Sequence, residues 1–157
     1  MSDPITVSRA AHAADESVQW DAFIGLIAGA VPADLTPVQR VAHLAWWYSS
    51  EVLNGGHDQY LGSGEEIDHR EVINALTTIG ARCQADVLAE ALTYFREAAT
   101  TMPDDYAELL RWQEQYGYAG TMGAFDRRFH ACRPPIEASL RERYLRDHEP
   151  AFIRWVP

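Results

Sequence analysis

The chain has 157 residues, of which 47% are hydrophobic, and its 13 basic and 23 acidic residues give a formal net charge of −10. All 13 basic residues are arginines, which excludes chemistry that needs a phosphate-loop lysine, a Schiff-base lysine or a lysine general base. The negative charge also argues against direct nucleic-acid binding, because the chain would repel phosphates. Length and hydrophobic content predict a single domain over residues 1–157 with a buried core.

Membrane insertion and secretion are not expected. The longest apolar run, Phe23 to Val31, is about half the length that a membrane-spanning helix needs. The first residues lack the basic segment of a signal peptide. Cys83 and Cys132 are 49 positions apart and belong to no CxxC motif, which is typical of two buried free thiols in a reducing compartment. We therefore expect a cytoplasmic protein.

Two helices are predicted in the first third of the chain. Apolar residues recur at helical spacing from Trp20 to Val31, and Pro32 ends that helix. The next helix begins at Thr36, because Thr36, Pro37 and Gln39 have the chemistry of an N-cap, a first turn and a capping box.

The helix that begins at Thr36 is apolar almost all round and rich in Trp and Tyr, a pattern typical of the centre of a bundle. Asn54-Gly55-Gly56 predicts its end, and Gly62-Ser63-Gly64 predicts a loop. Apolar spacing predicts further helices around residues 72–79, 82–100, 103–112, 125–129 and 134–150, and no stretch alternates like a strand. The predicted fold is all-α, a single-domain bundle of about seven to eight helices around a buried Trp/Tyr-rich central helix.

One Glu-x-x-His motif, from Glu66 to His69, is a candidate metal site. A di-metal carboxylate bundle needs two such motifs and two further glutamates, so a single copy favours a solvated loop. Asp126 with His130 could form an acid–base pair, but nothing supplies a nucleophile, a base and an orienting group together. We therefore predict no cofactor, no metal and no enzymatic activity, with an uncharacterised enzyme carrying a metal near Glu66 and His69 as an alternative.

Acidic residues are concentrated in the first two-thirds of the chain. Residues 1–110 hold 17 acids and 5 arginines, whereas residues 111–157 hold 6 acids and 8 arginines. Asp86, Glu90 and Glu97 fall within about 40° of one another on the predicted helix of residues 82–100 and extend over about 16 Å. We predict a partner-binding acidic face from these three carboxylates and those of the neighbouring segments, namely Glu65, Glu66, Asp68, Glu71, Asp104, Asp105 and Glu108.

Two arguments favour a function for this acidic face. Like charges one helical turn apart cost about 0.2–0.5 kcal/mol, so the face does not serve helix stability. The net charge of −10 also exceeds the magnitude of about 2–8 that solubility asks of a small domain. Carboxylates in a line resemble the phosphates of DNA, which advance about 3.4 Å per residue on each strand. A protein that holds DNA with basic side chains could therefore accept this face.

The segment Glu51-Val52-Leu53-Asn54-Gly55-Gly56-His57-Asp58-Gln59-Tyr60 resembles the E-x-x-N-G-G-F-x-Q-[YF] signature of the bacterial DNA-mimic-protein family, formerly a domain of unknown function. Residues 75–81 read A-L-x-x-I-G-A, like a second block of that family. Tyr144, His148 and Phe152 match its C-terminal Y-x-x-x-H-x-x-x-F. The resemblance covers about residues 35–155 and departs at His57, where the family usually has an aromatic residue, and at Gly62-Ser63, where an Asn is common.

This resemblance implies an all-helical fold. For the member that gave the family its name, it also implies imitation of DNA towards a DNA-binding protein, as a dimer. Asn54, Gly55, Gly56 and Gln59 have the chemistry of a helix cap and a chain reversal, so the signature predicts structural work rather than binding.

We therefore predict a DNA-mimic-like protein that binds the basic surface of a DNA-binding protein, competes with DNA and can form a homodimer. An immunity protein that neutralises a basic nuclease toxin is an alternative that the same charges would fit. A third hypothesis, an interaction module in which charge has no role, predicts that salt would hardly affect complex formation.

Overall fold

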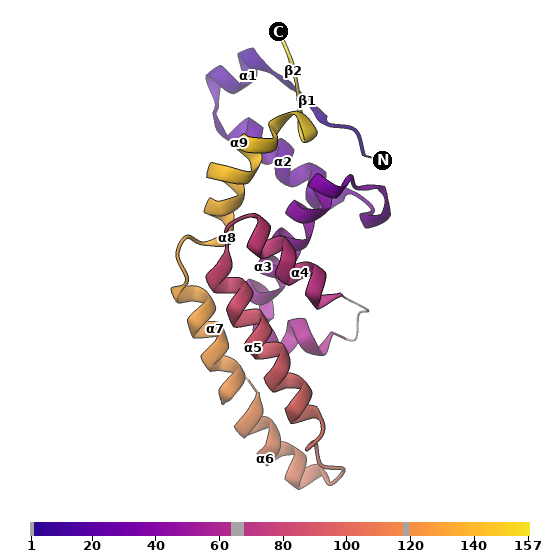
Figure 1. Ribbon diagram of the computed structural model, residues 1–157, viewed down its shortest axis with the longest axis vertical. Helices are drawn as coiled ribbons and strands as arrows, with labels where there is room; N and C mark the ends of the chain where they lie inside the picture. Colours follow the sequence, from indigo (N-terminus) through magenta and orange to yellow (C-terminus); the bar gives the residue numbers. More distant parts are fainter. Residues whose placement is uncertain (1, 64–67, 118–119) are drawn as a thin grey trace.

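The computed structural model describes residues 2–63, 68–117 and 120–157, and 76% of the structure is helical. The prediction of a mostly helical fold is confirmed. The molecule is elongated, with both termini at one end and helix α6 (Tyr106–Tyr116) at the other (Figure 1). Among the described helices, none is long and apolar enough to cross a membrane.

Among the N-terminal helices, α3 follows the predicted capping chemistry. Helix α1 (Arg9–Ala14) is followed by α2 (Ser17–Gly29), and Pro32 opens the short 3-10 helix η1 (Pro32–Asp34). Thr36 and Gln39 form the predicted capping box at the start of α3 (Pro37–Gly62). The buried Gln39 amide also donates to the carbonyls of Ser2 and Ala151, which ties both ends of the chain to α3.

Helix α3 does not end at Asn54 as predicted. It is interrupted at Gly56, whose φ of 74° and ψ of 179° lie outside the helical region, and it resumes as far as Gly62. The glycine pair of the signature therefore kinks a continuing helix instead of reversing the chain. Beyond the kink, the buried residues His57 and Tyr60 can reach the helices that follow.

Four longer helices follow: α4 (His69–Thr78), α5 (Arg82–Ala99), α6 and α7 (Thr121–Ala131). Helix α5 runs to the lower end of the molecule in Figure 1, and α6 and α7 return alongside it. The chain then forms α8 (Ile136–Ala138), the π-helical turn η2 (Ser139–Tyr144), α9 (Leu145–His148) and η3 (Glu149–Ala151).

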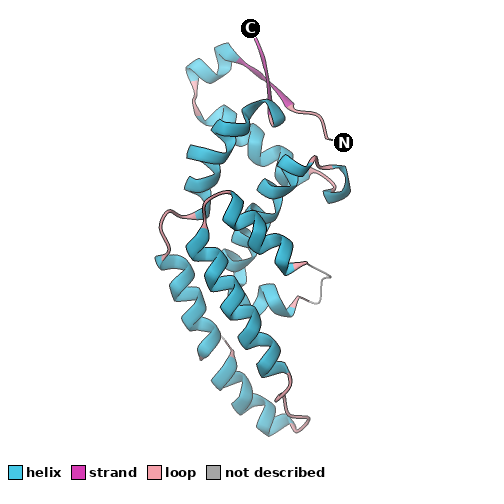
Figure 2. Cartoon of the chain, viewed as in Figure 1, coloured by secondary structure: helices cyan, strands magenta, loops and turns pink. Residues whose placement is uncertain are grey.

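Two short strands correct the prediction of a strandless chain. Strands β1 (Ile5–Ser8) and β2 (Ile153–Val156) pair in parallel, with Ile5 opposite Ile153 and Ser8 opposite Val156. They lie at the end of the molecule where the termini meet (Figure 2). Each strand has four residues and its partner is at the opposite end of the chain, so local periodicity could not reveal the pair.

A disulfide joins Cys83 to Cys132, which corrects the prediction of two free thiols. Cys83 lies at the start of α5, and Cys132 directly follows α7. Because these helices run in opposite directions (Figure 1), the start of one meets the end of the other, and the two Cα atoms are 5.7 Å apart. The separation of 49 positions in the sequence conceals this proximity.

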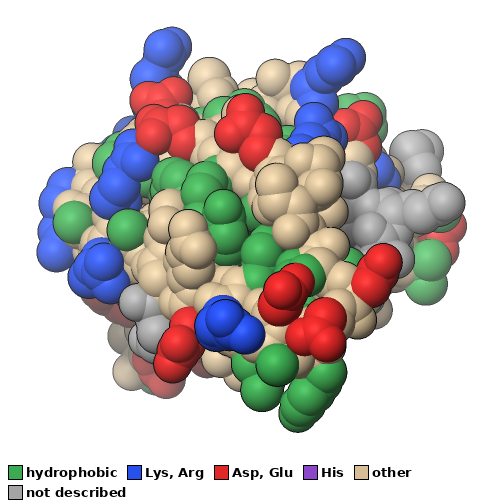
Figure 3. Space-filling view, turned by 90° about the horizontal axis from the view of Figure 1, so that it is seen from below, with side chains coloured by type: hydrophobic (Ala, Val, Ile, Leu, Met, Phe, Trp, Pro, Cys, Tyr) green, Lys and Arg blue, Asp and Glu red, His purple; other side chains and the backbone are tan. Residues whose placement is uncertain are grey.

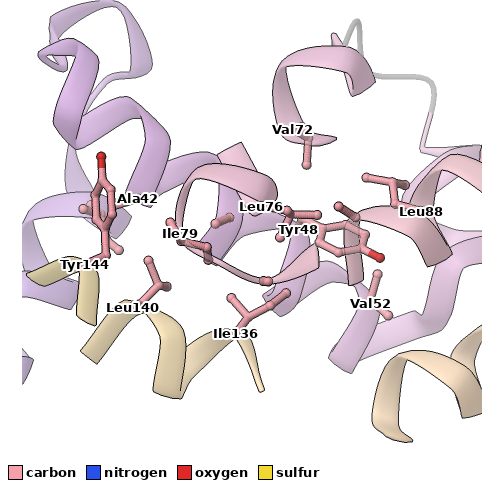
Figure 4. Packing of buried hydrophobic residues seen from close by; sticks show 14 of the residues in the cluster. Ala42, Tyr48, Val52, Val72, Leu76, Ile79, Leu88, Ile136, Leu140 and Tyr144 are labelled. Atoms are coloured by element: carbon pink, nitrogen blue, oxygen red, sulfur yellow. The ribbon is translucent and has the colours of Figure 1, made fainter. Parts of the chain in front are cut away.

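The buried core joins α3 to the helices around it (Figure 4). Tyr48 is fully buried, whereas the neighbouring Trp46 and Trp47 are half-buried. The Tyr144 hydroxyl donates a hydrogen bond of 3.1 Å to the carbonyl of Val38, which fixes the C-terminal segment against α3. The labelled core residues are Ala42, Tyr48, Val52, Val72, Leu76, Ile79, Leu88, Ile136, Leu140 and Tyr144.

Candidate partner-binding surface

The three carboxylates predicted to align on α5 are all exposed. Asp86, Glu90 and Glu97 lie on the side of α5 that faces away from its buried residues, among them Leu88 and Ala91. Eleven positions separate the first carboxylate from the last, which corresponds to about 16 Å along a helix. The same helical period therefore places these acids on one side of α5 and the buried residues on the other.

The middle carboxylate of this line is engaged by an arginine. Glu90 accepts two hydrogen bonds from Arg128 of α7, of 2.6 Å and 2.9 Å. These bonds lower the pKa of Glu90 and raise the pKa of Arg128. Asp86 also raises the pKa of Arg128, but by less than Glu90 does. The predicted acidic face is therefore partly neutralised by a residue that lies 38 positions away in the sequence.

A shallow, open groove of about 410 Å³ runs beside these acids and is lined by Ala89, Glu90, Thr93, Tyr94, Glu97 and Phe125. Its aromatic walls come from α5 and α7, and the ring centroids of Tyr94 and Phe125 are 5.9 Å apart. The Arg128 guanidinium lies over the Phe125 ring, 5.6 Å from the ring centroid. The groove thus combines carboxylates with aromatic faces.

The predicted acids at α6 lie at the far end of the molecule. Asp104, Asp105 and Glu108 are exposed. Asp105 caps α6 by accepting hydrogen bonds of 3.0 Å from the backbone amides of Ala107 and Glu108. In the view onto this end, carboxylates are interspersed with apolar and basic side chains rather than forming an unbroken acidic surface (Figure 3).

The predicted cluster of residues 65–71 is only partly available for binding. Glu65 and Glu66 lie outside the described residues. Asp68 caps α4 by accepting from the backbone amides of Arg70 and Glu71. Glu71 accepts hydrogen bonds of 2.5 Å and 2.6 Å from Arg40, and these lower its pKa.

The alternative metal site near Glu66 and His69 gains no further ligand from the described residues. Glu66 itself falls outside them, and the half-buried His69 ring lies 3.3 Å from the Tyr60 hydroxyl through Nδ1. Within residues 2–63, 68–117 and 120–157, no group of three or more His, Cys, Asp or Glu side chains is arranged to hold a metal ion.

A cavity of about 500 Å³ between α2, α3 and α4 has several of its polar groups engaged. Arg40 and Glu71 pair with each other at its wall, and Asp68 caps α4. His43 donates from Nδ1 to the carbonyl of Ile27 at 2.6 Å. The residues that line this cavity do not combine a nucleophile, a base and an orienting group.

The signature residues Asn54, Gly55, Gly56 and Gln59 lie at the kink of α3. A Cβ atom on Gly55 would overlap the side chain of Gln59, which reaches back to donate to Glu51 at 3.4 Å. Gly56 has a positive φ that favours glycine. The signature therefore coincides with a kink in a continuing helix, not with the cap and chain reversal that its residues predict.

The signature position His57 joins a buried polar chain. Asp126 Oδ1 accepts from the backbone amide and from Nδ1 of His57, and the Tyr48 hydroxyl lies 2.8 Å from His57 Nε2. Since an ionised carboxylate only accepts, Nδ1 carries the hydrogen and the neutral ring accepts from Tyr48 through Nε2. Burial lowers the pKa of His57, against the opposing effect of Asp126, and burial raises the pKa of Tyr48.

The fold and this surface define a mostly helical acidic protein. The chain matches the family model described as DMP19-like protein over residues 33–148. It therefore belongs to the DMP19-like family, which is the DNA-mimic-protein family that the signature suggested. The family is not known as enzymatic. Comparisons with curated proteins and with solved structures found no match.

Proposed function

We propose that this protein is a DNA mimic, whose acidic surface on α5 and α6 occupies the basic surface of a DNA-binding protein and competes with DNA. The observation that carries this proposal is the line of exposed carboxylates Asp86, Glu90 and Glu97 along α5, in a chain of net charge −10. Membership in the DMP19-like family supports it.

The physical basis is electrostatic. Exposed carboxylates spread over about 16 Å of helix present a row of negative charge, to which arginines and lysines that bind DNA phosphates are complementary. Because such charges are solvated, their attraction is screened by salt over about 8–10 Å at moderate ionic strength. The proposed complex should therefore weaken steeply as salt is added.

The ion pairs determine which acids are suited to test the proposal. Glu90 and Glu71 are held by Arg128 and Arg40, so changing them would disturb packing between helices as well as charge. Apart from the helix caps Asp68 and Asp105, four described acids of the predicted set are exposed and make no ion pair with a described residue: Asp86, Glu97, Asp104 and Glu108.

A variant with all four neutralised (Asp86→Asn, Glu97→Gln, Asp104→Asn and Glu108→Gln) changes the formal charge from −10 to −6. A control with the same charge change neutralises four exposed acids elsewhere: Asp3→Asn, Asp58→Asn, Glu137→Gln and Glu142→Gln. Each tagged protein would be incubated with native lysate at low salt and eluted with a salt gradient.

We expect the wild type and the control to retain a basic DNA-binding protein that elutes early, and the face variant to lose it. Retention by the face variant, or elution that ignores salt, would contradict the proposal. Capture of a basic nuclease instead would favour the immunity-protein alternative.

We also propose that two copies can pair through the outer side of α6. Tyr106 and Leu110 lie one helical turn apart and are 74% and 48% exposed, and the nearby Met102 is 58% exposed. Exposed apolar side chains that gather in one segment are typical of an interaction surface. Sedimentation of the wild type should show a dimer that is lost in Tyr106→Ser/Leu110→Ser. A monomeric wild type, or a dimer that survives this change, would contradict the pairing.

A further inference from the structure

The groove between α5 and α7 has the walls of a binding site for a planar cation. Tyr94 and Phe125 supply aromatic faces, and Glu90 and Glu97 place carboxylates along one edge. These two acids are seven positions apart on α5, which corresponds to about 10 Å along a helix. A guanidinium binds best where a carboxylate accepts two parallel hydrogen bonds and an aromatic ring covers its face.

One guanidinium of the chain itself already has these contacts. Arg128 donates to both oxygens of Glu90, at 2.6 Å and 2.9 Å, while it lies over the Phe125 ring. The other carboxylate, Glu97, makes no ion pair with any described residue. At one end of the groove, Glu90 therefore already holds the Arg128 guanidinium. Glu97 is a second carboxylate further along the groove.

We propose that this groove binds arginine side chains of a partner, and that Arg128 is an internal competitor for the Glu90 position. This inference rests on the proposed function in that the partner is a basic protein, and it names the partner group as a guanidinium. The side chains of Arg128 and Glu90 are 47% and 55% exposed, so solvent screens the pair and an incoming arginine can replace Arg128.

A groove that binds guanidinium groups predicts a difference between two arginines that net charge alone does not predict. Removing Arg128 should strengthen the binding of a guanidinium-bearing ligand by more than removing another exposed arginine does. Arg127 is the matched control, because it is the neighbouring residue on α7, is exposed, and makes no ion pair with a described residue. Arg128→Gln and Arg127→Gln both change the formal charge from −10 to −11.

The probe is a fluorescent hexa-arginine peptide, with hexa-citrulline as an uncharged peptide of nearly the same shape, in anisotropy titrations at low salt. We expect Arg128→Gln to bind hexa-arginine about three- to tenfold more tightly than the wild type, and Arg127→Gln to differ by less than about twofold. Hexa-citrulline should bind none of the three proteins.

A second variant tests whether the gain depends on the Glu90 carboxylate. Glu90→Gln combined with Arg128→Gln should lose the gain, because the position that Arg128 vacates then lacks its carboxylate. Equal affinities of the two single variants, weaker binding by Arg128→Gln, or a gain that persists without Glu90 would overturn the inference. Since the assay contains no DNA-binding protein, these outcomes are distinct from a failure of the proposed function in the lysate experiment.

Discussion

Asp126 and His57 are joined twice, although 69 positions separate them in the sequence. Asp126 Oδ1 accepts the backbone amide of His57 at 2.9 Å and its Nδ1 at 2.6 Å. The other oxygen, Oδ2, is buried, has no hydrogen-bond partner among the described residues, and lies 2.6 Å from the position that a Cβ on Gly56 would take. The carboxylate of α7 therefore fits against α3 only because residue 56 has no side chain.

Gly56→Ala should destabilise the protein for two reasons. Its φ of 74° with ψ of 179° is a conformation that costs other residues about 1–3 kcal/mol, and the new methyl group would displace Asp126. We expect the free energy of unfolding in urea to fall by at least that amount. Gly29→Ala is the control, because nothing lies within 4 Å of its added Cβ, and it should leave stability nearly unchanged. Equal stability of the two variants would contradict this role of Gly56.

Stability should fall as the solution is acidified below about pH 6.5. Burial lowers the pKa of His57 in the folded protein, so the unfolded chain binds more protons in this range and is favoured as pH falls. His69, whose pKa burial also lowers, acts in the same direction.

His57→Phe, which removes the titrating ring, should flatten part of this pH dependence between about pH 7.5 and pH 5.5. Urea unfolding at both pH values measures it. His148→Asn, at an exposed ring, is the control. An unchanged slope in His57→Phe would show that His57 does not contribute.

The disulfide between Cys83 and Cys132 should contribute strongly to stability. It closes a loop of 49 positions, for which loop-closure entropy corresponds to about 4 kcal/mol. Reduction of the purified protein should lower the urea midpoint to that of Cys83→Ser/Cys132→Ser, which reductant should not affect. If iodoacetamide labels both cysteines of the purified, unreduced protein, the bond is absent.

Local chemistry was enough to predict much of the fold. The capping box at Thr36 and Gln39 and the exposed line of acids on α5 each depend on residues within a few turns of one helix. The features that were predicted wrongly depend on distant segments. Gly56 kinks a helix instead of ending it because helix α3 continues on the far side, where His57 meets Asp126.

The candidate surface likewise has features that the local sequence predicted and features that depend on distant segments. The helical period was sufficient to place Asp86, Glu90 and Glu97 on one side, but it could not show that Arg128 approaches from α7 or that Arg40 holds Glu71 across 31 positions. An arginine can reach any helix that the fold brings near it, so its partner depends on tertiary packing. Sequence alone therefore overestimated the number of unpaired carboxylates.

The most direct test of DNA mimicry is competition with DNA. The DNA-binding protein captured from lysate would be bound to a labelled duplex, and the wild type, the four-acid face variant and its charge-matched control would each be titrated into the complex. We predict that the wild type and the control release the duplex, more weakly as salt is added, and that the face variant does not. Release by all three proteins, or a ternary complex in which the duplex stays bound, would contradict the account.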